Sequence, residues 1–149
     1  MNVKNERRDS KSKPIIILDS SVIIDLVSRK KEYTQACQKL MHDITYGNVD
    51  IAILPLVYWE VGNWAIRHHP KMATELISSI LLWDTIEHPL DIYVIGKAVD
   101  IAARYKGTTF YDASFHALAI ILGGTFLTND KAYYKATHTL GHVRLLRDY

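Results

Sequence analysis

The chain has a single cysteine, Cys37, so it cannot form an intramolecular disulfide. The neighbours of Cys37 predict an apolar helix face on which it acts as a small hydrophobic residue. The longest apolar run, 51–59, contains Pro55 and is far shorter than the roughly 20 residues of a membrane-spanning helix. No apolar segment follows the basic N-terminus before Pro14. We therefore expect a cytoplasmic protein that is neither secreted nor inserted into a membrane.

Several familiar catalytic motifs are also missing. The seven glycines form neither a G-x-G-x-x-G pattern nor a P-loop, which argues against a nucleotide cofactor. The seven histidines include the adjacent pair His68 and His69, but no H-E-x-x-H motif or cysteine pair accompanies them. We expect these two histidines to lie at the surface, near a helix end.

What is present predicts one globular domain. Of the 149 residues, 48% are hydrophobic and 23% charged, which is enough apolar material for a single core. The formal net charge is +2, and basic residues gather in the polar segment 1–13. We interpret 1–13 as a basic tail, either solvated or serving as an arm for nucleic acid, and 14–149 as the domain.

Apolar strands alternate with amphipathic helices along that domain. Strands are predicted at 14–18, 50–54, 85–88, 125–128 and 143–146, and helices at 22–27, 33–46, 55–69, 71–82, 91–105, 111–122 and 131–136. In the helix 91–105, we expect the inward face to carry Ile92, Ile95, Val99 and Ala102. Alternation of this kind predicts an α/β fold with a mostly parallel sheet and helices on both of its faces.

Four acidic residues occupy positions that such a sheet would bring together. Asp19 and Asp130 come just after strands, Asp112 opens a helix, and Glu60 lies inside a helix beside an apolar stripe. Ligands of open α/β sheets bind outside the carboxyl ends of the strands, where the strand order reverses. Four carboxylates so close together need a cation or raised pKa values.

Each acid also has an ordinary structural explanation. Asp19 and Asp130 are suitable helix caps or turn residues, and Asp112 suits the positive end of its helix. Glu60 is harder to explain in this way, because an acid on an apolar helix face needs a partner. A single shared site accounts for all four positions, whereas the structural explanations must be applied one by one.

The chemistry of such a site is that of a hard divalent metal. Carboxylates are the ligands that Mg²⁺ and Mn²⁺ prefer, and the absence of histidine and thiolate from the set argues against zinc. Sites of this kind catalyse phosphodiester hydrolysis well. Five polar residues are candidates for supporting the acids or touching substrate, each with helix capping, packing or surface exposure as the alternative: Ser21, Asn63, Thr128, Asn129 and His116.

Three segments and the closing strand together resemble the PIN-domain family of metal-dependent ribonucleases, most closely its VapC-type toxins. The segments are ILDSSVIIDL, LPLVYWEVGNWA and TTFYDASFHALAIILGGTFLTND, and with the closing strand they cover the chain from about Ile15 to the C-terminus. The resemblance implies a three-layer α/β/α sandwich with a four- or five-stranded sheet. It also implies cleavage of RNA with Mg²⁺ or Mn²⁺.

By the same resemblance, Asp19, Glu60, Asp112 and Asp130 match the acidic metal-binding positions, and Ser21 and Asn63 match their polar companions. Some relatives carry a further acid shortly after the last aspartate, whereas positions 131–134 here are Lys, Ala, Tyr and Tyr. The second metal position therefore lacks that ligand.

Toxins of this type are neutralised by a cognate antitoxin and form homodimers. An apolar face either makes one of these contacts or is buried within the domain; its residues are Met72, Leu76, Ile77, Ile80 and Leu81. The leading hypothesis is thus a metal-dependent endoribonuclease, the toxin of a toxin–antitoxin pair. The alternatives are a PIN nuclease that matures ribosomal RNA without an antitoxin, and a catalytically silent RNA-binding module. A phosphatase or phosphoacceptor domain is disfavoured, because Asp19 is followed by Ser-Ser-Val rather than by a D-x-D pattern.

Overall fold

The computed structural model describes residues 12–28 and 34–149. The first eleven residues of the predicted basic tail lie outside the described residues. The described chain forms a five-stranded parallel sheet in the order β3-β2-β1-β4-β5. Its strands are β1 (Ile15–Leu18), β2 (Asp50–Ile53), β3 (Thr85–Glu87), β4 (Thr125–Thr128) and β5 (Val143–Leu145).

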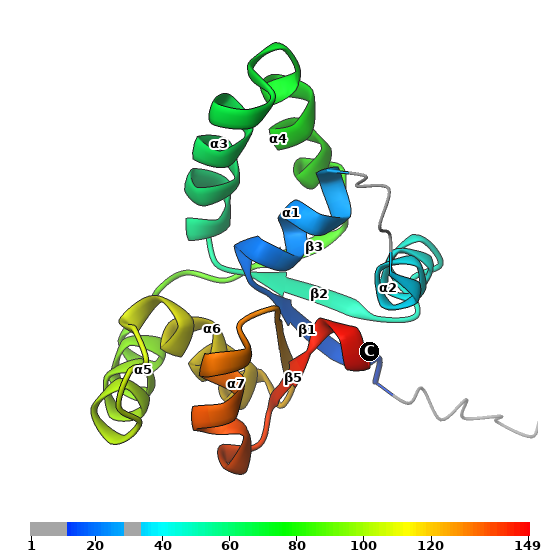
Figure 1. Ribbon diagram of the computed structural model, residues 1–149. Helices are drawn as coiled ribbons and strands as arrows, with labels where there is room; N and C mark the ends of the chain where they lie inside the picture. The colour runs from blue at the N-terminus through cyan, green and yellow to red at the C-terminus, as the bar shows by residue number, and fades with distance from the viewer. Residues whose placement is uncertain (1–11, 29–33) are drawn as a thin grey trace, which may run out of the picture.

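Helices cover the sheet on both sides. They are α1 (Ser20–Ser28), α2 (Gln35–Thr45), α3 (Leu56–His68), α4 (Ala73–Leu81), α5 (Ile92–Arg104), α6 (Phe110–Leu122) and α7 (Lys131–Thr137). Helices α1, α3 and α4 lie on one side of the sheet, and α5, α6 and α7 lie on the other (Figure 1). The predicted three-layer sandwich is confirmed. Within residues 12–28 and 34–149, none of the helices is long and apolar enough to cross a membrane.

The core is centred on β1, because this strand pairs with a neighbour on each edge. Ile16 is in register with Ile51 of β2, and Ile17 is in register with Phe126 of β4. All four side chains are at most 5% exposed, as expected for β-branched and aromatic residues in a strand covered on both faces. The strand order reverses at β1, so the carboxyl ends of β1 and β4 flank the predicted ligand position.

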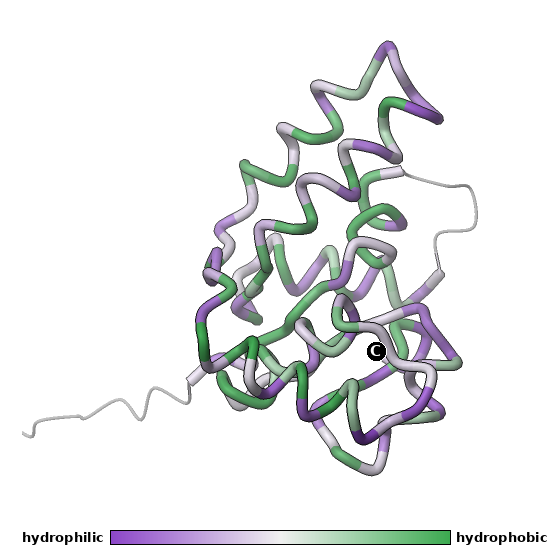
Figure 2. The backbone as a smooth tube through the Cα atoms, turned by 90° about the vertical axis from the view of Figure 1, so that its left-hand side faces the viewer, coloured by the Kyte–Doolittle hydropathy of each residue, from purple (hydrophilic) through white to green (hydrophobic). Residues whose placement is uncertain are grey.

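Local sequence determines where several helices begin and end. Thr34, Asp91 and Thr109 accept backbone N–H groups at the starts of α2, α5 and α6. Gly123, with φ of 65°, ends α6 in the left-handed conformation that glycine adopts without strain. Hydrophobic and hydrophilic residues alternate around the helical turns in Figure 2, which is the amphipathic pattern expected of helices on a sheet.

Two burial predictions have different outcomes. Cys37 is 4% exposed on α2, which confirms its role as a small core residue. The predicted inward face of α5 is wrong for Ile92 and Val99, which are 72% and 51% exposed, whereas Ile95 and Ala102 are half-buried. The buried residues of this helix are Val94, Ala98 and Ile101. Both sets have helical three-four spacing, and the one that packs against α6 becomes the core face.

Gly124 is required by a close approach between β4 and β1. A Cβ atom at this position would lie 2.6 Å from the Ile15 carbonyl oxygen and 2.9 Å from Ile17 Cδ1. The Ile15 oxygen is backbone and cannot move away without disturbing β1. The absence of a side chain at Gly124 therefore lets the central strand pair form.

Gly124→Ala is expected to lower the free energy of unfolding by about 1–3 kcal/mol, because the added methyl group overpacks the β1–β4 junction. Gly96→Ala is the matched control. Gly96 lies inside α5 with no atom within 4 Å of a built Cβ, so this substitution should stabilise the protein by about 0.5–1 kcal/mol. Urea unfolding measures both, and equal stabilities for the two variants would contradict the proposed close approach.

Candidate active site

All four predicted acids line one pocket at the carboxyl edge of the sheet. The pocket has a volume of about 570 Å³, and its lining comprises Asp19, Ser20, Ser21, Ile24, Glu60, Tyr111, Asp112, Phe115, Asn129 and Asp130. These residues come from α1, α3, α6 and the β4–α7 junction, which are far apart along the chain. The fold thus brings together the carboxylates that the sequence placed at strand and helix ends.

Asp19 is the most deeply buried of the acids, at 7% exposure. It directly follows β1 and caps α1, because its Oδ1 atom accepts the Val22 N–H at 2.9 Å and the Ser21 hydroxyl at 2.6 Å. Burial raises the pKa of the Asp19 carboxyl above its usual value, although these hydrogen bonds and one from Thr128 oppose the rise. Capping and site formation are therefore roles of the same side chain.

Glu60 is held by Ser20, which was not among the polar candidates identified from the sequence. The Ser20 hydroxyl on α1 donates a hydrogen bond to Glu60 Oε2 on α3. This contact supplies the partner that an acid beside an apolar stripe requires. The sequence places both Ser20 and Ser21 at the junction of β1 and α1, but only the orientation of α1 determines which serine faces Glu60.

Asp112 occupies the first turn of α6, where Thr109 holds it in a reciprocal cap. The Thr109 hydroxyl donates to Asp112 Oδ2 at 2.7 Å, and the Asp112 N–H donates back to Thr109 Oγ1 at 3.2 Å. Burial raises the pKa of the Asp112 carboxyl, and the negative charge of Asp130 adds to the rise. Asp112 and Asp130 line the same pocket, so the charge of Asp130 disfavours ionisation of Asp112.

Asp130 follows β4 and caps α7. Its Oδ1 atom accepts the Tyr133 N–H at 2.9 Å, and its own N–H donates to Thr128 Oγ1 at 3.0 Å. Thr128 is fully buried and its side chain also hydrogen-bonds the Asp19 carboxylate. Thr128 thus connects the acid after β1 with the acid after β4.

The remaining polar candidates differ in whether they reach the pocket. Asn129 lines the pocket and donates from Nδ2 to Asp25 Oδ2 at 2.8 Å, a partner on α1 that the sequence did not indicate. Asn63 is exposed on α3, one turn after Glu60, and does not line the pocket. His116 is fully buried, which agrees with the packing role expected for it.

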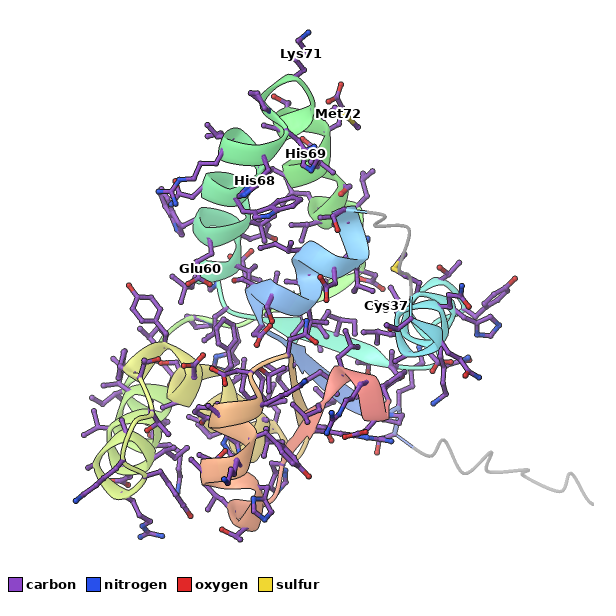
Figure 3. The ribbon with its side chains drawn as sticks, in the orientation of Figure 1. Cys37, Glu60, His68, His69, Lys71 and Met72 are labelled. Carbon is purple, nitrogen blue, oxygen red and sulfur yellow. The ribbon has the colours of Figure 1, made fainter. Side chains whose placement is uncertain are left out.

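The histidine pair lies away from this pocket. Glu60 is near the end of α3 closest to the sheet, whereas His68 and His69 are at the opposite end of that helix (Figure 3). Both histidine side chains are in ring contact with Trp64. The surface position expected for the pair at a helix end is confirmed, since both residues are exposed.

The donor set fits a hard divalent cation. Every titratable group lining the pocket is a carboxylate except the Tyr111 hydroxyl, and no lysine or arginine of the described chain is part of the lining. Within residues 12–28 and 34–149, however, no three His, Cys, Asp or Glu side chains are arranged so that they could already hold an ion together. Each acid is bonded to a nearby hydroxyl or backbone N–H group, and its carboxylate keeps further oxygen lone pairs that could coordinate an ion.

An apolar groove of about 430 Å³ adjoins the acidic pocket. The two share Tyr111, and the groove is otherwise lined by Leu54, Pro55, Leu56, Trp59, Leu90, Phe110 and Ser114. Trp59 is 73% exposed and directly precedes Glu60. The acids are therefore bordered by a large accessible hydrophobic surface.

Comparison with known families agrees with this geometry. The PIN domain family matches residues 16–138, which include all four acids. The chain belongs to the PIN domain family. No curated protein matches it. The predicted resemblance to the PIN-domain family is confirmed, and the fold is similar to that of VapC structures.

Solved structures share the fold of this PIN domain at low sequence identity. A toxin–antitoxin complex from Klebsiella pneumoniae aligns with a TM-score of 0.65 and 18% identity, covering 88% of this chain and 97% of the other. FitAcB from Neisseria gonorrhoeae aligns with a TM-score of 0.64 and 18% identity, covering 87% and 95%. VapC20 from Mycobacterium tuberculosis, described as a Sarcin-Ricin loop cleaving toxin, aligns with a TM-score of 0.62 and 16% identity, covering 81% and 94%.

Metal-free Asp112→Asn protein is expected to melt a few degrees above the wild type near neutral pH. The folded state raises the pKa of this carboxyl, so its ionised form reduces stability above that pKa, and the penalty fades as the pH falls toward the usual value of 3.8. The new amide oxygen can still accept the Thr109 hydroxyl.

Thermal unfolding with a chelator, followed from about pH 7 down to about pH 4, measures this difference. Asp100→Asn, at an exposed position of α5, is the control and should leave the melting temperature nearly unchanged. A difference in melting temperature between Asp112→Asn and the wild type that does not change with pH would contradict the electrostatic explanation.

Proposed function

We propose that this PIN domain is a metal-dependent endoribonuclease and the toxin of a toxin–antitoxin pair. The observation that carries the proposal is the convergence of Asp19, Glu60, Asp112 and Asp130 on one pocket at the strand-order reversal. The raised pKa values of Asp19 and Asp112 support it, because a pocket that disfavours the free carboxylates is one that a cation would stabilise.

The four carboxylates would hold Mg²⁺ or Mn²⁺. When bound, such a cation supplies Lewis acidity that activates water and neutralises charge on the scissile phosphate. The chain's own contribution is to fix the acids: Ser20 orients Glu60, Ser21 and Thr128 orient Asp19, and Thr109 orients Asp112. In this proposal Ser21 and Thr128 act through Asp19, whereas Asn129, on the pocket wall, would contact substrate.

The choice of RNA as substrate and of a toxin role follows from the likeness to known proteins. Similar structures are toxin–antitoxin complexes, and one is a toxin described as cleaving the Sarcin-Ricin loop. An antitoxin partner would neutralise the enzyme by covering the acids. The cytoplasm is where such a substrate and such a partner are both found.

Purified protein is expected to cleave mixed single-stranded RNA when Mn²⁺ or Mg²⁺ is present, and to lose this activity with a chelator. Asp112→Asn should reduce cleavage by at least about a hundredfold, because it removes one charged metal ligand. Asp100→Asn should cleave like the wild type. Cleavage that is unchanged in Asp112→Asn would count decisively against the assignment.

Two further functions compete with this proposal and can be separated from it. An RNA-processing nuclease would cleave RNA in vitro, but its expression alone would not arrest growth. For the toxin we expect arrest by the wild type and none by Asp19→Asn. A silent RNA-binding module would show no heat of Mn²⁺ or Mg²⁺ binding in a calorimetric titration.

The same proposal includes a homodimer, for which an exposed apolar surface beside the acidic pocket is the candidate interface. Trp59, Leu90 and Phe110 line the groove next to the pocket, and Ile92 and Tyr93, in the first turn of α5, follow Leu90 along the chain and are exposed. The α4 face expected from the sequence is less suitable, because Ile80 is fully buried and only Met72 and Leu81 of that set are largely exposed. Extended apolar surface of this kind is typical of protein interfaces.

Light scattering after size exclusion should give about twice the 17.0 kDa mass of one chain. Ile92→Arg, at a residue 72% exposed, is expected to shift the mass to that of a monomer by placing a charge in the interface. Leu82→Arg, at a residue 86% exposed beside α4, is the control. A dimer broken by Leu82→Arg and not by Ile92→Arg would assign the interface to α4 instead.

A further inference from the structure

His116 is a fully buried histidine that the proposed chemistry does not use. It lies on α6, one helical turn after Asp112, and both of its ring nitrogens have partners. Nε2 is 2.7 Å from the Gly141 carbonyl oxygen, and Nδ1 is 3.0 Å from the Tyr133 hydroxyl. His116 therefore connects α6 to α7 and to the turn before β5.

These contacts determine the protonation of the ring. A carbonyl oxygen only accepts hydrogen bonds, so Nε2 must carry a hydrogen and donate it to Gly141. Burial lowers the pKa of the His116 imidazole, which keeps the ring neutral. Nδ1 is then an acceptor, and the Tyr133 hydroxyl donates to it.

Tyr133 connects this bond to the acidic pocket. Its hydroxyl bonds His116 on α6, while its backbone N–H bonds the Asp130 carboxylate at 2.9 Å. Its ring packs edge-on against both His116 and Phe126. Asp112 and Asp130 are thus connected in three steps. One turn of α6 leads from Asp112 to His116, a side-chain hydrogen bond leads to Tyr133, and the Tyr133 N–H leads to the Asp130 carboxylate.

We propose that the hydrogen bond between His116 and Tyr133 positions the pocket by fixing the separation of Asp112 and Asp130, and thereby sets its affinity for a divalent cation. The inference rests on the proposed function, since it assumes that these acids share a cation. His116 and Tyr133 are positioning residues in this scheme. Neither lines the acidic pocket, and both act through the acid next to them on the same helix.

The two bonds of His116 can be separated by substitution. An asparagine amide oxygen replaces Nδ1 and can still accept from Tyr133, whereas a glutamine amide nitrogen replaces Nε2 and can still donate to Gly141. Mn²⁺ affinity, measured by electron paramagnetic resonance, is the readout, because general loss of packing would affect all of these variants alike.

We expect His116→Gln and Tyr133→Phe each to weaken Mn²⁺ binding on the order of tenfold, the size found when a group that orients a metal ligand is lost. The double variant should bind no more weakly than Tyr133→Phe, which removes the bond to His116 and also the side-chain hydrogen bond between Tyr133 and Thr137. His116→Asn should stay within about twofold of the wild type, and so should Tyr134→Phe, whose ring contacts His138 instead.

Activity gives a second readout. Saturating Mn²⁺ should restore most of the cleavage rate of His116→Gln and Tyr133→Phe, while the KM for RNA remains unchanged. If both variants bound Mn²⁺ as tightly as the wild type, this inference would be wrong while the proposed function would stand. Equal weakening of Mn²⁺ binding by His116→Asn and His116→Gln would have the same consequence. No Mn²⁺ binding by the wild type would overturn the proposed function and this inference with it.

Discussion

The pairing of β1 with β2 on one edge and with β4 on the other fixes where the acids of this protein lie. Because both pairs are parallel, the three strands end at the same edge of the sheet, and the chain leaves β1 and β4 beside one another. The Asp19 N–H still donates to the Leu127 carbonyl at 3.4 Å, so the acid is held at the last step of the sheet. Its carboxylate caps α1 through Oδ1 and also lines the pocket, where burial raises its pKa.

The features predicted from the sequence are those that depend on local pattern and chain order. Apolar runs located all five strands within a few residues, and three-four apolar spacing located the helices, so that α2, α5 and α6 begin within two residues of their predicted starts. The four acids were recognisable because each follows a strand or belongs to a helix that starts at that edge. Chain order alone therefore predicted a shared pocket, although it could not supply the distances within it.

What the sequence missed depends on helix rotation and on contacts between distant segments. The α5 face was assigned wrongly because that helix carries two apolar stripes of equal spacing, and only packing on α6 distinguishes Val94 and Ala98 from Ile92 and Val99. The Ser20–Glu60 bond joins residues 40 positions apart, and the Asn129–Asp25 bond joins residues 104 positions apart. No periodicity relates such pairs, so a single sequence gives no sign of them.

The hydroxyl and backbone N–H partners of the acids fix the orientation of the carboxylates in this pocket. Asp19 has Ser21 and Thr128, Glu60 has Ser20, and Asp112 has Thr109, so each carboxylate is hydrogen-bonded before any ion arrives. Small zinc-binding domains differ from this protein, because such domains are unfolded without the metal and the free energy of metal binding drives their folding. Here the hydrophobic core around β1 supplies the fold, and the hydroxyls limit the repulsion that remains among the acids. The residues around the pocket thus orient the acids, whereas most of the stability of the domain comes from the hydrophobic core.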